Sequence, residues 1–219
     1  MDNCQKSQLI GIIVAVCGLI VMAGWIFGIP VLTSILPFWV TMKFVTALSF
    51  LLCGVLLYFI NEQLRGEADL SAIIIPVCAF LVLLLMSSLL LSVFVGVRTG
   101  IESLFVREDY GAVRTVYPGL PSLMTMVSFI LVAIAGFLVS SDLEGLRQKL
   151  SWIGGAVSVI GCISVLGYSW GVPVLYYSVA GLSSAMAFHT SLLFVLLGYG
   201  LVLAGGCYEL GRMRAVRRR

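Results

Sequence analysis

The sequence has few charged residues and few of the side chains that enzymes use for chemistry. Only 11% of its 219 residues are charged, whereas soluble proteins carry roughly 25%. One histidine and ten acidic residues form no Ser-His-Asp set, carboxylate pair, phosphate-binding loop or metal-ligand spacing. We therefore expect no enzymatic activity and no metal site. Nucleic acid is not an expected partner either, because the basic C-terminal run is short and follows an apolar segment.

The six cysteines form no recognisable pattern. They are scattered along the chain without a Cys-x-x-Cys pair, and most of them lie inside apolar runs: Cys4, Cys17, Cys53, Cys78, Cys162 and Cys207. Free cysteine is among the most buried residue types. We therefore expect buried, unpaired cysteines rather than disulfides or a zinc site.

Apolar residues, in contrast, make up 61% of the chain, and the mean hydropathy is +1.13. A helix of about 20 apolar residues can cross the hydrocarbon core of a bilayer. Six segments meet this criterion, near residues 8–28, 42–60, 71–97, 121–140, 150–169 and 184–206. The sequence predicts an all-α integral membrane protein with a six-helix membrane domain over residues 1–211 and a basic tail over residues 212–219.

The distribution of lysine and arginine predicts the orientation in the membrane, because basic residues gather on the cytoplasmic side. If both termini are cytoplasmic, that side holds Lys6, Arg65, Arg147, Lys149, Arg212, Arg214, Arg217, Arg218 and Arg219. The outer side then holds Lys43, Arg98, Arg107 and Arg114. We expect a multi-pass protein of the inner membrane with both termini inside. In the long outer connection, residues 101–105 have the apolar spacing of a short surface helix.

An internal repeat is visible in two pairs of segments. Residues 42–54 (MKFVTALSFLLCG) match residues 186–198 (MAFHTSLLFVLLG), and residues 24–32 (GWIFGIPVL) match residues 167–175 (GYSWGVPVL). Residues 125–129 (TMVSF) repeat the central motif more loosely. We interpret the chain as three hairpins of one type. Because repeats of two spans keep the same orientation, a pseudo-threefold arrangement about the membrane normal is expected.

The repeated positions supply most of the candidate binding residues. Trp25, Tyr168 and Trp170 fall at the outer lipid–water boundary, where they form either an aromatic belt or the rim of an outward-facing pocket. Thr46, Thr125 and Thr190 lie near the outer start of the even-numbered spans, where they cap or hold helices, or face one another across the bundle. Two prolines, Pro30 and Pro173, are expected to end the preceding helices.

His189 is the only histidine and lies beside Thr190 in a predicted span. It is either a neutral imidazole bonded to a carbonyl or a proton sensor or haem ligand, for which a Met such as Met42, Met124 or Met126 could complete a pair. Lys43 is expected to reach the lipid headgroups as an anchor. Small residues four apart, such as Gly11 and Ala15 or Gly154 and Ser158, favour close helix contacts.

The repeated motif resembles the multi-span N-terminal membrane regions of bacterial sensor histidine kinases and diguanylate cyclases. Those regions carry an M-x-P/F-x-T-A-L-x-F-x-L-x-G motif at the start of even-numbered helices, as in residues 42–54 and 186–198, and an outer segment similar to residues 101–105. The resemblance implies a signal-input module that passes a helix shift to a fused output domain or a cytoplasmic partner, and it implies a homodimer. It implies no particular ligand or cofactor. No kinase or cyclase sequence follows Arg219, which leaves open an excised membrane region or a free-standing relative.

The sequence thus favours a sensory module that responds to a stimulus at its outer face or within the bilayer. Two alternatives stay open. One is a structural or assembly subunit of a membrane complex, and the other is a small transporter or a binder of quinone, lipid or haem. Transport is less favoured because the predicted spans contain no acidic residue, and transporters usually carry ionisable groups near mid-membrane.

Overall fold

The computed structural model describes residues 1–36, 38–66, 70–97, 99–101, 118–141, 145–176 and 184–217, with side chains up to Cys207 in the last helix. The regular structure of this part is entirely helical. Six long helices occur: α1 (Asn3–Ile26), α3 (Phe44–Arg65), α4 (Ser71–Val95), α5 (Leu123–Ser140), α6 (Leu146–Ser169) and α7 (Phe188–Arg217). Two short helices, α2 (Pro30–Thr33) and η2 (Pro173–Leu175), follow α1 and α6.

All six long helices are long and apolar enough to cross a membrane, α7 through its segment Phe188–Cys207. This confirms the prediction of a multi-pass, all-helical membrane protein. The predicted helix bounds differ most at three ends, because α7 continues from residue 206 to Arg217, α1 begins earlier and α3 ends later. Helix α1 begins at Asn3 instead of residue 8 because Asp2 and Gln5 form a capping box, and α3 continues five residues past residue 60 until Gly66 ends it at φ +89°.

Consecutive long helices form three antiparallel pairs, α1 with α3, α4 with α5 and α6 with α7. The second helix of each pair lies further inside the bundle. In α3, α5 and α7, 61%, 50% and 61% of the span is buried, against 33% in each of α1, α4 and α6. The bundle therefore has an inner set of helices and an outer set.

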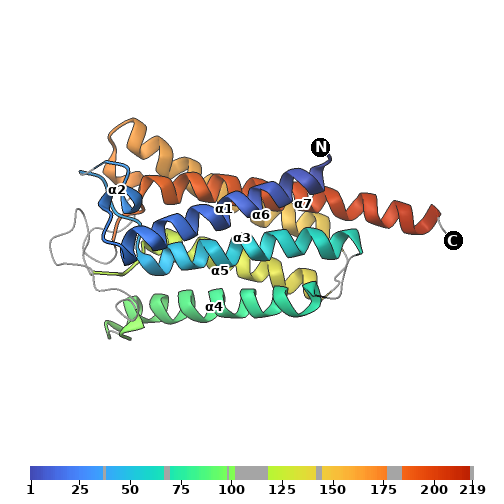
Figure 1. Ribbon diagram of the computed structural model, residues 1–219, viewed down its shortest axis with the longest axis horizontal. Coiled ribbons are helices and arrows are strands. Elements are labelled where there is room, and N and C mark those ends of the chain that lie inside the picture. The colour runs from blue at the N-terminus through green and yellow to red at the C-terminus, as the bar shows by residue number, and fades with distance from the viewer. Residues whose placement is uncertain are drawn as a thin grey trace.

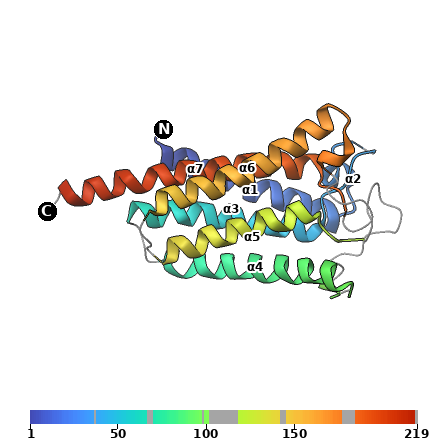
Figure 2. The ribbon, with the colours of Figure 1, turned by 180° about the vertical axis from the view of Figure 1, so that it is seen from behind.

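Both termini lie at one end of the bundle, as both views show (Figures 1 and 2). We call this the terminal end. We call the opposite end the loop end; it contains α2, η2 and the starts of α3, α5 and α7. Helix α7 extends past the other helices at the terminal end (Figure 1), and the arginine-rich residues 212–217 continue this helix.

Glycines allow the backbones of paired helices to approach closely, as the small-residue spacing predicts. A Cβ atom on Gly18 would lie 2.6 Å from the carbonyl oxygen of Ala47, and one on Gly161 would lie 2.6 Å from that of Ser191. Gly54 is enclosed in the same way by the backbone of α1. Such contacts bring α1 against α3 and α6 against α7 without intervening side chains.

The two prolines do not end the helices before them, contrary to the prediction. Helices α1 and α6 end four residues before these prolines, and each is followed by a glycine with positive φ, +65° at Gly28 and +66° at Gly171. Pro30 and Pro173 then open α2 and η2, where a missing backbone N–H costs nothing. Glycine, not proline, therefore redirects the chain here.

The prediction of unpaired cysteines is wrong for one pair. Cys4 and Cys207 form a disulfide with their Cα atoms 5.4 Å apart, and it joins the start of α1 to α7 at the terminal end. Among the unpaired cysteines, Cys53 and Cys78 are buried as expected, whereas Cys162 is exposed. Of the predicted surface helix at 101–105, residues 102–105 lie outside the described part of the chain.

Candidate binding site at the loop end

Three phenylalanines bring the inner helices together. Phe50 of α3, Phe129 of α5 and Phe194 of α7 are fully buried, and each ring contacts the other two. The ring centroids are 4.8 Å apart between Phe50 and Phe129, 4.9 Å between Phe50 and Phe194, and 4.8 Å between Phe129 and Phe194. The centre of the bundle is therefore filled by aromatic rings at this level.

The three predicted threonines lie one turn closer to the loop end. Thr46, Thr125 and Thr190 each precede one of these phenylalanines by four residues, so each shares its helix face. They are almost completely buried, with exposed fractions of 2%, 2% and 1%. The structure thus brings the three threonines to the inner side of α3, α5 and α7, directly above the aromatic rings.

None of these threonines is the N-cap that the sequence suggested. Each is the third residue of its helix, and the N-cap positions of α3 and α5 are Lys43 and Ser122. The Ser122 hydroxyl accepts a hydrogen bond from the backbone N–H of Thr125 at 3.1 Å and lies 2.7 Å from its hydroxyl oxygen.

Lys43 is a residue of this site that sequence reasoning assigned wrongly. Instead of reaching the headgroups, it is buried with an exposed fraction of 3%, and it has an interaction within the chain. The cause is the extended segment before α3, in which Val40 and Met42 are buried and the N–H of Met42 donates to the carbonyl oxygen of Thr33 at 2.9 Å. We call Lys43, Thr46, Ser122, Thr125 and Thr190 the central site.

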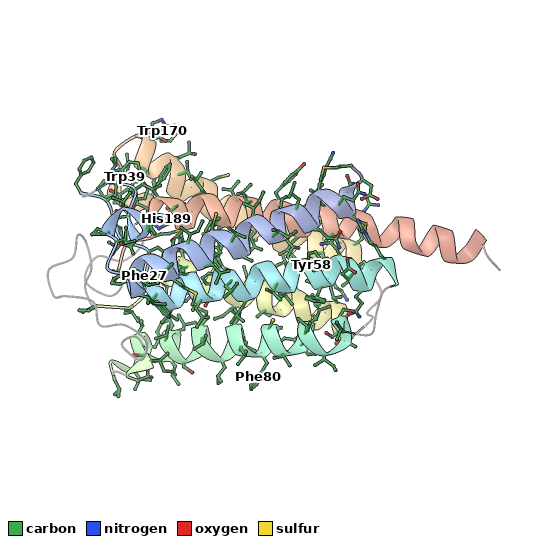
Figure 3. The ribbon with its side chains drawn as sticks, viewed as in Figure 1. Phe27, Trp39, Tyr58, Phe80, Trp170 and His189 are labelled. Atoms are coloured by element: carbon green, nitrogen blue, oxygen red, sulfur yellow. A yellow bond between two sulfur atoms is a disulfide. The ribbon has the colours of Figure 1, made fainter. Side chains whose placement is uncertain are left out.

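Two of the three predicted aromatic residues, Trp25 and Tyr168, form hydrogen bonds to the non-helical segments that precede α3 and α7. The indole N–H of Trp25 donates to the backbone carbonyl oxygen of Met42 at 2.8 Å. The hydroxyl of Tyr168 donates to the backbone carbonyl oxygen of Met186, also at 2.8 Å. Trp170, in contrast, is 69% exposed at the outer edge of the loop end (Figure 3). Trp25 and Tyr168 therefore pack into the loop end, and Trp170 does not.

An aromatic pocket of about 170 Å³ lies at the loop end. It is lined by Phe38, Trp39, Val40, Tyr168, Gly171 and Tyr176. The Trp39 ring lies 5.2 Å from that of Tyr168 and 4.8 Å from that of Phe188, between centroids. Trp39 and Tyr176 were not singled out from the sequence, because they lie outside the repeated motif.

His189 lies in the first turn of α7, between Phe188 of the aromatic group and Thr190 of the central site (Figure 3). Its Nε2 atom is buried and has no hydrogen-bond partner among the described residues. Within the same residues, no group of three His, Cys, Asp or Glu side chains is close enough to hold a metal ion.

A second polar cluster lies inside the terminal end. The Ser7 hydroxyl donates to the carbonyl oxygen of Gly200 at 2.8 Å and accepts from the side-chain amide of Asn61 at 2.8 Å, linking α1, α3 and α7. Asn61 is fully buried, and its Oδ1 has no partner in the described chain. Nearby, Gln8 donates to the carboxylate of Glu62. The predicted span ended at residue 60, so both Asn61 and this acid were missed.

Comparison with models of known protein families, with curated proteins and with solved structures gives no match for the chain.

Proposed function

We propose that this protein is a membrane-embedded sensory module that receives a stimulus at the loop end and passes it along α7 to the terminal end. The continuity of α7 carries the proposal. This helix has 30 residues, which corresponds to a length of about 45 Å. It begins at the central site with His189 and Thr190 and projects past the other helices (Figure 1). A displacement of its first turn can thus reach the projecting segment without crossing a loop.

We place both termini on the cytoplasmic side of the inner membrane. The support is the charge distribution, because Lys6, Arg65, Arg147 and Lys149 lie at the terminal end together with the arginines of α7. The loop end then faces outward. The projecting segment, residues 208–217, is where we place the contact with an output domain or a cytoplasmic partner, and a homodimer would bring two such segments together.

We also propose that the three hairpins are repeats around an approximate threefold axis. Matching hydrogen bonds in the first and third hairpins, from Trp25 to Met42 and from Tyr168 to Met186, support this interpretation. The nearly equal distances among the three phenylalanine rings support it for all three hairpins. In this arrangement, the central site lies on the axis.

The aromatic rings also favour binding over transport. Phe50, Phe129 and Phe194 are fully buried and in mutual contact directly below the threonines. A ligand that enters the central site from the loop end meets these rings and stops there. Binding can then change the packing of α3, α5 and α7, which is the difference between two states that a signalling helix requires.

The aromatic pocket favours one alternative, a binder of a small planar ring such as a quinone head. Its volume of about 170 Å³ is close to that of an engineered cavity of about 150 Å³ that binds benzene. Quenching of tryptophan fluorescence by a water-soluble benzoquinone, lost in Trp39→Leu, would support this alternative.

The sensory proposal can be tested by measuring the distance between two spin labels at the terminal end. One label is placed at Ile73, which is exposed near the start of α4, and the other at Gly211 in the projecting segment. The unpaired cysteines are replaced by alanine. We expect Thr190→Val and His189→Ala to shift the distance distribution in pulsed electron paramagnetic resonance.

The matched control is Leu192→Ala, which alters an exposed residue of the same helix. It should leave the distribution unchanged. An unchanged distribution in both site variants, with thermal stability retained, would contradict the proposed role of α7.

A further inference from the structure

We propose that the disulfide between Cys4 and Cys207 is reversible, and that its oxidation state is a second input that controls the projecting segment of α7. The inference rests on the proposed function, from which it takes the cytoplasmic position of the terminal end. The co-reactant is a small thiol of the cytoplasm together with its disulfide. Two observations carry the inference, namely the compartment in which the bond lies and its place along α7.

The terminal end combines two properties that are rarely found together. Its basic residues, among them Lys6, Arg65 and Arg147, support its assignment to the cytoplasmic side. The same end contains the disulfide between Cys4, near the start of α1, and Cys207 in α7. Thiols are kept reduced in the cytoplasm, and the disulfides that form there are usually transient and serve catalysis or redox sensing. A disulfide at this end is therefore expected to open and close with the redox state.

The disulfide lies at the point where α7 leaves the bundle. Cys207 ends the segment Phe188–Cys207, which is long and apolar enough to cross the membrane, and the projecting segment follows it directly. Gly205 and Gly206 come immediately before Cys207. Glycine lowers the stability of a helix interior, because it loses more conformational freedom on folding than other residues do. The covalent link to α1 therefore lies beyond two residues that weaken α7, and it fixes the direction in which the projecting segment leaves the bundle.

Helices α1 and α7 are also joined by noncovalent contacts further inside the bundle. The Ser7 hydroxyl donates to the carbonyl oxygen of Gly200 at 2.8 Å, and Ile10 packs against the same glycine. Gly200 precedes Cys207 by about two helical turns. These contacts hold the body of α7 in place when the disulfide is open. Reduction should therefore release the projecting segment while the bundle stays folded.

The position of Cys4 gives a small thiol a route to the bond. Cys4 is 5% exposed and Cys207 is 1% exposed, but Asn3 and Gln5 on either side of Cys4 are exposed. Cys4 lies in the first turn of α1, and helix ends fray. The hydrogen bonds between Asp2 and Gln5 that close this turn are themselves exposed to solvent. Local opening of this one turn uncovers the Cys4 sulfur without unfolding the bundle.

Reduction proceeds by two thiol–disulfide exchanges and transfers two electrons and two protons. A thiolate of the small thiol attacks Sγ of Cys4, and the S–S bond breaks so that Cys207 leaves as a thiolate and takes up a proton. A second thiolate attacks the small-thiol sulfur that is now bound to Cys4, and Cys4 leaves as a thiolate and is protonated. The two small thiols end as one disulfide. The reverse sequence closes the bond between Cys4 and Cys207, so one redox couple accounts for both directions.

Counting free thiols in redox buffers tests whether the bond is reversible. The full chain in nanodiscs, with its four unpaired cysteines replaced by alanine, is equilibrated with mixtures of reduced and oxidised glutathione, alkylated and weighed. Structural disulfides resist reduction by glutathione, whereas labile ones do not. We expect two free thiols in the most reducing mixture and none in the most oxidising one. Either number at every ratio would overturn the inference, because the bond would then be permanent or would never form.

Spin labels at Ile73 and Gly211 test whether the bond fixes the projecting segment. The labels are attached through thioethers, which the redox buffer does not cleave, while Cys4 and Cys207 are oxidised. We expect a narrow distance distribution in the oxidised protein and a broader one after reduction. The double variant Cys4→Ser/Cys207→Ser should give the broad distribution in both buffers. Labels at Ile73 and Gln148, both exposed at the terminal end of the bundle itself, are the matched control and should give the same distribution in both states.

The inference is overturned if reduction leaves the distribution between Ile73 and Gly211 unchanged, or if the control distribution broadens equally. Failure of the sensory proposal gives a different result. If reduction broadens the distribution but Thr190→Val has no effect in the oxidised protein, the redox input stands and the signal from the loop end falls. If Thr190→Val shifts the distance and reduction does not, α7 carries a signal that the disulfide does not control.

Discussion

The rings of Phe50 and Phe129 meet edge to face with their centroids 4.8 Å apart, although α3 and α5 are not consecutive long helices. Together with Phe194 they form an aromatic contact that joins α3, α5 and α7. We predict that Phe50→Ala lowers the free energy of unfolding by about 3–5 kcal/mol, because it leaves a cavity among fully buried side chains. Unfolding by a denaturing detergent in mixed micelles measures the change.

A lipid-facing phenylalanine provides the control for this substitution. Phe80 is 55% exposed on the outer side of α4 (Figure 3), so Phe80→Ala should change stability by less than about 1 kcal/mol. The double variant Phe50→Ala/Phe129→Ala should cost less than the sum of the single variants. Equal losses for Phe50→Ala and Phe80→Ala would argue against a shared aromatic centre.

Two neighbouring glycines of α6 should respond oppositely to the same substitution. A Cβ atom on Gly154 would collide with the carbonyl oxygen of Gly198 in α7, whereas one on Gly155 would meet no atom within 4 Å. Gly154→Ala is therefore expected to destabilise the protein by about 1–3 kcal/mol. Gly155→Ala is expected to stabilise it by up to about 1 kcal/mol, because alanine favours the helix. Equal effects on detergent unfolding would show that α6 and α7 pack through another face.

The hydrogen bond between Ser7 and Asn61 should couple α1 to α3 energetically. A double-mutant cycle with Ser7→Ala and Asn61→Leu is expected to give a coupling energy of about 0.6–1.7 kcal/mol, the range for polar contacts between membrane helices. The same cycle with Ser87→Ala in place of Ser7→Ala is the control, because Ser87 is exposed and bonds within α4. Coupling near zero for Ser7 would mean that the two side chains do not pair.

Alkylation followed by mass spectrometry can count the paired cysteines. In the denatured, unreduced protein we expect four cysteines to react, namely Cys17, Cys53, Cys78 and Cys162. Reduction should raise the number to six by releasing Cys4 and Cys207. Cys4→Ser should give five reactive cysteines with or without reductant. Six reactive cysteines before reduction would contradict the pairing.

The orientation in the membrane can be measured with introduced cysteines and an impermeant maleimide. Val174 is exposed at the loop end, and Gln148 is exposed near the start of α6 at the terminal end. In a background without native cysteines, intact cells should label Val174→Cys and not Gln148→Cys. The reverse pattern would place the termini outside and would contradict the assignment from basic residues.

The six membrane helices could be predicted because long apolar runs are a local property of the chain. The helix bounds were less predictable where short-range polar contacts set them. Asp2 caps α1, which therefore begins earlier than the apolar pattern indicates. Helix α3 continues through the polar residues Asn61 and Glu62, beyond the end of its apolar run at residue 60. Apolar content alone does not predict a helix end that is set by a capping residue or by a polar last turn.

The candidate site was predictable only in part. The repeated motif identified Thr46, Thr125 and Thr190, yet it did not show that all three would be almost completely buried. Lys43 was misassigned because its position near the membrane boundary suggested an exposed anchor, whereas the extended segment before α3 carries it into the bundle. Phe50, Phe129 and Phe194 occupy the same position in the repeated motif, but their mutual contact depends on how α3, α5 and α7 pack together.

The sequence by itself determined that the protein enters the membrane and how many helices it can place there, because the cost of exposing polar groups to lipid acts on each segment separately. Only the tertiary structure decided which helices lie inside, which cysteines meet and which polar groups are enclosed at the two ends. Cys4 and Cys207 illustrate the difference, since they lie near opposite ends of the sequence and are joined at one end of the bundle. Such contacts depend on side-chain packing between segments that are distant in the sequence, and no local sequence pattern predicts this packing.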